Sequence, residues 1–124
     1  MNTNPYSSDS GPYQFYRYYS FACPPGMVDQ LSRSDVDRGG VVKFRVPLRN
    51  GQIFVVIEFP DGIENVYNPN DTYEYKFGCV PALFDKLVNP DAKIGGRLTS
   101  VIPHTGDMVL WTMERLRVTK NSRR

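Results

Sequence analysis

The sequence predicts a mainly β fold: a small antiparallel barrel or sandwich of about five to seven strands, with one short helix between strands. Three observations support this prediction. Apolar residues alternate with polar ones over 42–48, aromatic residues do so over 73–77, and Asn50-Gly51 separates two apolar runs as a hairpin turn. With 124 residues, 40% of them hydrophobic, the chain is long enough for one domain with its own core.

The hairpin at Asn50-Gly51 predicts a pairing register for the strands on either side. A two-residue type I′ turn at this position pairs Arg49 with Gln52. Four apolar pairs and one ion pair then favour the register, because a slip by one residue would turn every side chain to the other face. The expected pairs are Leu48 with Ile53, Val46 with Val55, Phe44 with Ile57, Val42 with Phe59 and Lys43 with Glu58.

Turn residues and apolar spacing predict the other elements. Pro60-Asp61-Gly62 and 68–71 indicate turns, and 24–40 is expected to be a loop. A helix is expected over 81–88, ended by Asn89-Pro90. Further strands are expected over 63–67, 72–77, 97–102 and 108–118, an element order that resembles an OB-type barrel, and we expect no internal repeat. The predicted interior residues are Phe44, Val46, Val55, Ile57, Phe59, Leu83, Phe84, Leu87, Leu110 and Trp111.

Residues 1–21 form an N-terminal arm that holds seven of the sixteen aromatic residues. A disordered tail is poor in aromatics, so the arm is expected to dock on the protein's own core, on a second copy or on a partner. Over part of the arm, aromatic residues recur at every second position, as in a strand that is added to the edge of a sheet. We expect a β-rich domain over 22–118 and a basic tail over 119–124. The candidate association residues are Tyr6, Tyr13, Phe15, Tyr16, Tyr18, Tyr19 and Phe21.

The net charge of +2 comes from the C-terminal end, where residues 111–124 alone sum to +4. These basic residues solubilise the chain or contact phosphates of nucleic acid or of anionic lipid. In the predicted register, a basic and aromatic face forms opposite the core, as in proteins that bind single strands, unless the arm or a second subunit covers it. The candidates on the tail and on this face are Arg115, Arg117, Lys120, Arg123, Arg124, Lys43, Arg45, Phe54 and Tyr67.

Catalytic chemistry has one weak candidate, His104 with Asp107 in a turn, where a carboxylate could orient an imidazole base. A nucleophile would have to be Cys23 or Cys79, and neither is placed beside His104 by the sequence. The spacing of the glycines does not match a phosphate-binding loop, and the spacing of the cysteines does not match a metal site. We therefore expect no enzyme, no cofactor and no metal.

The sequence contains no apolar stretch long enough to cross a bilayer and no signal peptide, so we expect an intracellular protein. The leading hypothesis is a non-enzymatic interaction or assembly protein that self-associates or docks a protein partner through its arm. In composition the chain resembles small viral or phage assembly proteins. The alternative is an OB-like protein that binds single-stranded nucleic acid with the basic and aromatic strand face and the tail.

Overall fold

A computed structural model of the chain describes residues 10–117. These residues form six strands, two α-helices and two short 3-10 helices. In chain order the elements are β1 (Gly11–Cys23), η1 (Pro25–Met27), α2 (Val28–Asp37), β2 (Val41–Pro47), β3 (Ile53–Val66), β4 (Thr72–Cys79), η2 (Pro81–Leu83), α3 (Phe84–Lys93), β5 (Arg97–Pro103) and β6 (Val109–Leu116).

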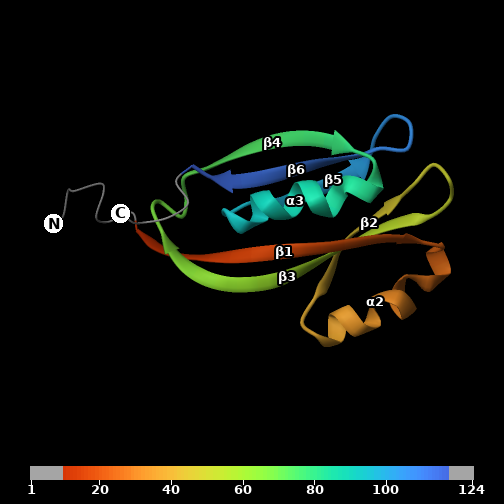
Figure 1. Ribbon diagram of the computed structural model, residues 1–124, viewed down its shortest axis with the longest axis horizontal. Coiled ribbons are helices and arrows are strands. Elements are labelled where there is room, and N and C mark those ends of the chain that lie inside the picture. Colours follow the sequence, from red (N-terminus) through yellow and green to blue (C-terminus); the bar gives the residue numbers. More distant parts are fainter. Residues whose placement is uncertain (1–9, 118–124) are drawn as a thin grey trace.

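The strands make two antiparallel three-stranded sheets (Figure 1). The first sheet has the order β1-β3-β2 and the second has the order β4-β6-β5. The prediction of a mainly β fold is confirmed, and six strands lie within the expected range. The sheets are not closed into one barrel, so the OB-like strand arrangement is not found.

The two sheets belong to two halves of the chain that repeat one plan. Each half runs strand, 3-10 helix, α-helix, strand, strand, and each sheet places its third strand in the middle. Equivalent residues are 56 positions apart, as Cys23 and Cys79 are. Residues are identical at Tyr19/Tyr75, Phe21/Phe77, Cys23/Cys79, Pro25/Pro81, Asp29/Asp85, Leu31/Leu87, Asp35/Asp91, Gly39/Gly95, Gly40/Gly96, Pro47/Pro103 and Glu58/Glu114. The expectation of no internal repeat is therefore wrong.

Local geometry repeats along with the sequence. The β2–β3 pairing shifts register between Val42 and Phe44, and the β5–β6 pairing does so between Leu98 and Ser100, again 56 positions apart. Each helix ends on a glycine pair whose first member has φ near +100°, a conformation that favours glycine. The second glycine donates its N–H to the carbonyl five residues earlier, at 2.9 Å in both halves. The halves therefore share their bulge and their helix termination.

The main core lies between the sheets, with α3 inserted on the β1 side and β2 contacting β5 on the other side (Figure 1). Phe84 of α3 stacks edge-on against Phe54 of the first sheet and Trp111 of the second, at 5.1 and 5.2 Å between ring centroids. The opposite face of the first sheet is covered by α2, where Val28 packs with Val55, Ile57 and Phe59. The central strand β3 is therefore buried on both faces over Phe54–Phe59.

The β2–β3 hairpin forms at the predicted place with a different register. Val46 pairs with Phe54 rather than Val55, because three residues form the loop: Gly51 donates to the Leu48 carbonyl and is the loop residue with positive φ. A type I turn closed by a left-handed glycine needs no positive φ at Asn50. The bulge near Lys43 shifts the register once more. Lys43 still forms the predicted ion pair with Glu58, at 3.3 Å.

Three other local predictions are wrong. The expected loop over 24–40 contains α2, whose buried face carries polar Ser32 and Asp35 and so lacks a clear apolar stripe. α3 continues through Pro90 to Lys93, held by buried Ala92. Strand β3 runs through Pro60-Asp61-Gly62, because a bulge with Gly62 at positive φ absorbs the kink.

The predicted core is mostly confirmed. Val46, Val55, Ile57, Phe59, Phe84 and Trp111 are buried, and Phe44 and Leu110 are partly buried. Leu83 and Leu87 are exposed instead, because α3 turns its Phe84, Val88 and Ala92 side into the core.

Candidate binding groove

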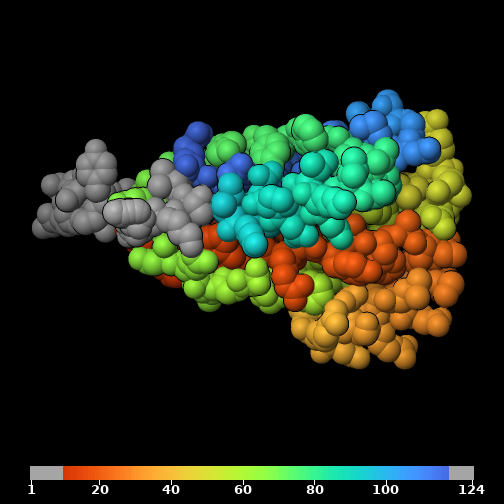
Figure 2. All heavy atoms as spheres, in the orientation of Figure 1, coloured from red at the N-terminus to blue at the C-terminus, as the bar shows by residue number. Residues whose placement is uncertain are grey.

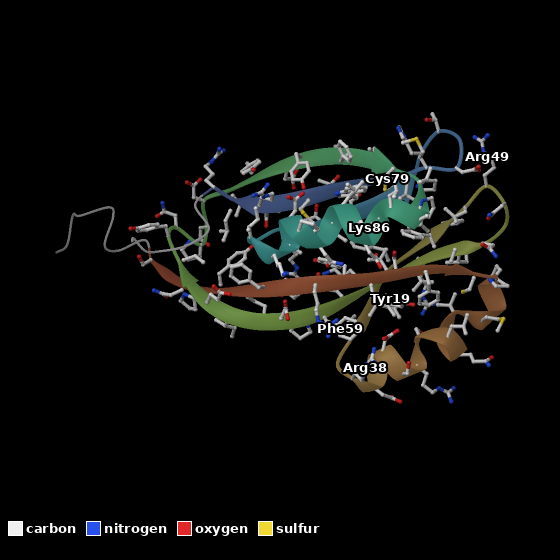
Figure 3. The ribbon with its side chains drawn as sticks, in the orientation of Figure 1. Tyr19, Arg38, Arg49, Phe59, Cys79 and Lys86 are labelled. Atoms are coloured by element: carbon white, nitrogen blue, oxygen red, sulfur yellow. The ribbon has the colours of Figure 1, made fainter. Side chains whose placement is uncertain are left out.

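A groove of about 510 Å³ runs between α2 and the edge strand β1 on the outer side of the first sheet. Figure 3 shows three of its side chains together: Tyr19 from β1, Phe59 from β3 and Arg38 from α2. Its volume lies in the range of small ligand sites, enough for one or two side chains of a partner. The lining residues are Arg17, Tyr19, Phe21, Ala22, Leu31, Ser34, Asp35, Arg38 and Phe59.

Aromatic and aliphatic side chains provide most of the groove's apolar surface. Tyr19 and Phe21 follow each other on one face of β1, with ring centroids 5.9 Å apart. Tyr19 remains 46% exposed although the strand that carries it is part of the sheet. Leu31 of α2 is also exposed and lines the opposite wall. The groove therefore offers an apolar contact surface that the fold itself does not cover.

Two arginines place positive charge along the groove. The guanidinium of Arg17 lies 4.2 Å from the centre of the Phe59 ring and 3.8 Å from Asp61. Arg38 pairs with Asp35 across one helical turn. The arginine side chains are 54% and 68% exposed, so both guanidiniums can still donate hydrogen bonds to an incoming ligand. An apolar floor between guanidiniums suits an apolar side chain flanked by a carboxylate.

The equivalent position in the second half is occupied by the protein's own side chains. Tyr75, the counterpart of Tyr19, donates its hydroxyl to Asp91, the counterpart of Asp35. Arg115 replaces Phe59 and pairs with the same Asp91 carboxylate at 3.4 Å. Burial and then the hydrogen bond to Asp91 raise the pKa of Tyr75 well above its usual value. The first half therefore has an open groove where the second half has an internal hydrogen-bond network.

The predicted association residues divide into two groups within strand β1. Phe15 and Tyr18 are buried, Tyr13 and Tyr16 pack against the core, and the Tyr18 hydroxyl donates to Glu58 at 2.7 Å. Residues 11–21 of the predicted arm thus lie in the chain's own first sheet. Tyr19 and Phe21 face the groove. Tyr6 lies outside the described residues.

The predicted basic and aromatic strand face is not formed. Phe54 is 1% exposed and points toward Phe84, because α3 and the second sheet cover the face on which it lies. Lys43 pairs with Glu58, and Arg45 pairs with Asp29 at 3.4 Å. Tyr67 is partly buried directly after β3. A stacking surface for bases therefore does not exist at these positions.

The predicted basic end is described only in part. Arg115 pairs with Asp91, and Arg117 pairs with Asp71 at 3.1 Å while lying over the Tyr73 ring. Both arginines are thus engaged within the fold. Lys120, Arg123 and Arg124 lie outside the described residues.

His104 and Asp107 lie in the exposed β5–β6 loop, beside a small cavity of about 250 Å³. Within residues 10–117, no hydrogen bond joins their side chains and no group of three metal-ligating residues comes together. Cys23 and Cys79 are buried free thiols at equivalent positions, and burial raises the pKa of Cys79. A raised pKa keeps this thiol protonated, which disfavours a nucleophilic role.

Sequence reasoning found Tyr19 and Phe21 but not the other groove residues. One of them, Arg17, lies in the predicted arm. Leu31, Asp35 and Arg38 lie in the segment 24–40 that was expected to be a loop. An alignment of the two halves would have shown that Tyr19, Phe21, Leu31 and Asp35 all recur 56 positions later. That recurrence is the signal for a shared strand and helix arrangement.

A scan against protein-family models finds no match, and searches of curated proteins and of solved structures find none either. Among the described residues, no helix has the length and apolar character needed to cross a membrane.

Proposed function

We propose that the protein is a non-enzymatic binding module that captures a short segment of a partner protein in the groove between α2 and β1. One observation supports this most strongly. Tyr19 is nearly half exposed in a groove that two accessible guanidiniums also line, whereas the hydroxyl of its counterpart Tyr75 donates to Asp91. An exposed aromatic side chain next to arginine is the composition typical of binding hot spots.

The groove also favours one kind of partner segment. An aromatic or long aliphatic side chain would stack against Tyr19 and Phe21 and contact Leu31. A neighbouring Asp or Glu would accept hydrogen bonds from the remaining N–H donors of Arg17 or Arg38, beside the pairs that these arginines make with Asp61 and Asp35. The partner is therefore expected to present an acidic residue beside a large apolar one.

Selection from a random displayed-peptide library tests the proposal directly. Peptides that bind the full chain should be enriched in Asp or Glu next to Phe, Tyr, Trp or Leu. Arg38→Glu and Tyr19→Ser should each weaken binding of the selected peptides by about tenfold or more. Arg33→Glu provides the matched control, because it makes the same charge change on α2 at a residue that does not line this groove.

Two results would overturn the proposal. One is a set of selected peptides without acidic and apolar enrichment. The other is a set whose affinity for Arg38→Glu and Tyr19→Ser equals that for the unaltered chain, with thermal unfolding showing that both variants are folded.

A further inference from the structure

The edge strands β1 and β4 differ in whether another part of the chain covers their free edge. β1 and β4 are equivalent strands, each paired on one side only with the central strand of its sheet. The other side of β1 is covered by α3: Asn89 accepts from the Tyr18 N–H and donates to the Tyr18 carbonyl, both at 2.8 Å. Asp85 similarly accepts from the backbone and hydroxyl of Ser20. The edge of β1 is therefore closed to another strand.

The corresponding edge of β4 has no such cover among residues 10–117. Because β1–β3 and β4–β6 share one register, the counterparts of Tyr18 and Ser20 are Glu74 and Lys76. Their backbone N–H and carbonyl groups point away from β6, as those of Tyr18 and Ser20 point away from β3. An edge strand with unpaired backbone groups can accept an added strand.

The side chains of β4 are complementary to those of a second, antiparallel β4. We propose that two copies of this chain associate by pairing β4 with β4 around a two-fold axis at Tyr75. In that register, Glu74 lies opposite the partner's Lys76, and Tyr73 lies opposite the partner's Phe77, each contact occurring twice. Glu74 and Lys76 share the outward backbone direction, so their groups meet in hydrogen-bonded pairs. A parallel arrangement would instead place like charges side by side.

Exposed apolar side chains flank the same edge. Phe77 is 52% exposed, and Val80, Leu83 and Leu87 are exposed as well. Leu87 is the counterpart of Leu31, which lines the groove beside β1, so it lies on the side of α3 that faces β4. Figure 2 shows α3 and β4 next to each other on one surface. Strand pairing would bring these residues of the two copies together and add apolar burial to the backbone hydrogen bonds.

The proposed pairing creates one continuous sheet of six strands, β5-β6-β4 joined to its symmetry mate. It leaves the α2–β1 groove of each copy open, since β1 belongs to the other sheet. The dimer would therefore present two grooves and bind a divalent partner with avidity. This inference does not depend on the proposed function of the groove.

Charge reversal on β4 tests the pairing through the mass of the full chain, measured by size-exclusion chromatography with light scattering. The unaltered chain should elute with the mass of two chains. E74K and K76E should each weaken association by about tenfold or more, because each replaces two attractive contacts by two repulsive ones. Mixing the two variants should restore a dimer containing one copy of each, since one β4 is then doubly positive and the other doubly negative.

Arg49→Glu, in the β2–β3 loop and outside the proposed β4 pairing (Figure 3), is the matched charge control and should leave the dimer unchanged. Unfolding is not expected for E74K, because Glu74 lies opposite Glu114 in β6 and the substitution removes that like-charge contact. A chain that is monomeric at every soluble concentration overturns the proposal. Dimers that tolerate both E74K and K76E, or variants that fail to form a mixed dimer, overturn it equally, while peptide binding in the groove would be unaffected.

Discussion

The two halves of this chain share one backbone plan and differ in what surrounds it. In the first half, α2 covers one sheet face and leaves an open groove beside β1. In the second half, α3 contacts both sheets, and Tyr75, Asp91 and Arg115 fill the equivalent space. The shared residues therefore specify strand pairing and helix termination, whereas the residues that differ specify whether a surface is available for binding.

Equivalent faces of the two sheets differ in the same way. Tyr18, Phe44 and Val56 lie on the first-sheet face that packs on α3 and the second sheet. Their counterparts in the second sheet are Glu74, Ser100 and Thr112, and Lys76 donates a hydrogen bond to Thr112 across that face at 2.9 Å. The second sheet therefore lacks, on this face, the apolar side chains with which the first sheet packs on the other half, and the face resembles the polar outer face of a terminal unit in repeat proteins.

The largest difference between the halves should appear at the first core position of each helix. Phe84→Ala should lower the free energy of unfolding by about 3–5 kcal/mol, because the ring fills the space between Phe54 and Trp111. The equivalent Val28→Ala should cost about 1–3 kcal/mol, since α2 packs on one sheet only. Urea denaturation measures both values. Equal costs would contradict the central position of α3.

The equivalent glycines after the helices should differ by less. A Cβ at Gly40 would lie 2.7 Å from Ile57 and 2.8 Å from Phe59, both part of a packed core. A Cβ at Gly96 would meet the flexible Met113 thioether at 2.6 Å, and in both halves a backbone carbonyl lies 2.9 Å away. Gly40→Ala should therefore cost about 2–3 kcal/mol and Gly96→Ala about 1–2 kcal/mol in thermal unfolding. The reverse order would contradict this account.

Most of the strands could be predicted from the sequence, because alternation and turn residues are local signals. The hairpin register could not, since Asn50-Gly51 fits both a two-residue type I′ turn and the three-residue loop that forms, and the bulge near Lys43 shifts the register again. Helix α2 was missed because its buried face carries Ser32 and Asp35. The alternation predicts an exposed face for Phe54, which is buried, because alternation cannot show that a sheet is covered on both sides.

For the candidate site, the aromatic residues of β1 were predicted and the groove was not. Tyr19 and Phe21 contribute one wall, but Leu31, Asp35 and Arg38 come from the helix that the sequence did not reveal. A groove between two elements can be predicted only when both elements and their separation are known. The repeat at 56 positions would have predicted helix α2, because its counterpart α3 has the stronger apolar pattern.

The hydroxyl groups of the equivalent tyrosines give a smaller contrast. Tyr75→Phe should lower the free energy of unfolding by about 1–2 kcal/mol, since it removes the hydroxyl that donates to Oδ2 of the partly buried Asp91 carboxylate and leaves only Arg115, on Oδ1. Tyr19→Phe should change it by less than about 0.5 kcal/mol, because no hydrogen bond of this hydroxyl is found among the described residues. Chemical denaturation of both variants makes the comparison, and a cost at Tyr19 equal to that at Tyr75 would contradict an open groove.

The smallest effect concerns the equivalent acids Asp85 and Asp29. Burial raises the pKa of Asp85 above its ordinary value of 3.8, although hydrogen bonds from Ser20 act in the opposite direction. The folded chain therefore holds this proton more tightly than the unfolded chain, and the stability gained from protonation is lost as the pH rises from 3.8 through the raised pKa. Asp85→Asn should thus become more stable relative to the unaltered chain over that range. The change should stay below about 1 kcal/mol, because solvent screens the partly exposed carboxylate. Thermal unfolding from pH 3 to pH 7 measures this change.

Asp29→Asn is the matched control, because the Asp29 side chain is 88% exposed. A stability difference at Asp85→Asn that does not vary with pH would show that burial does not govern the Asp85 carboxylate.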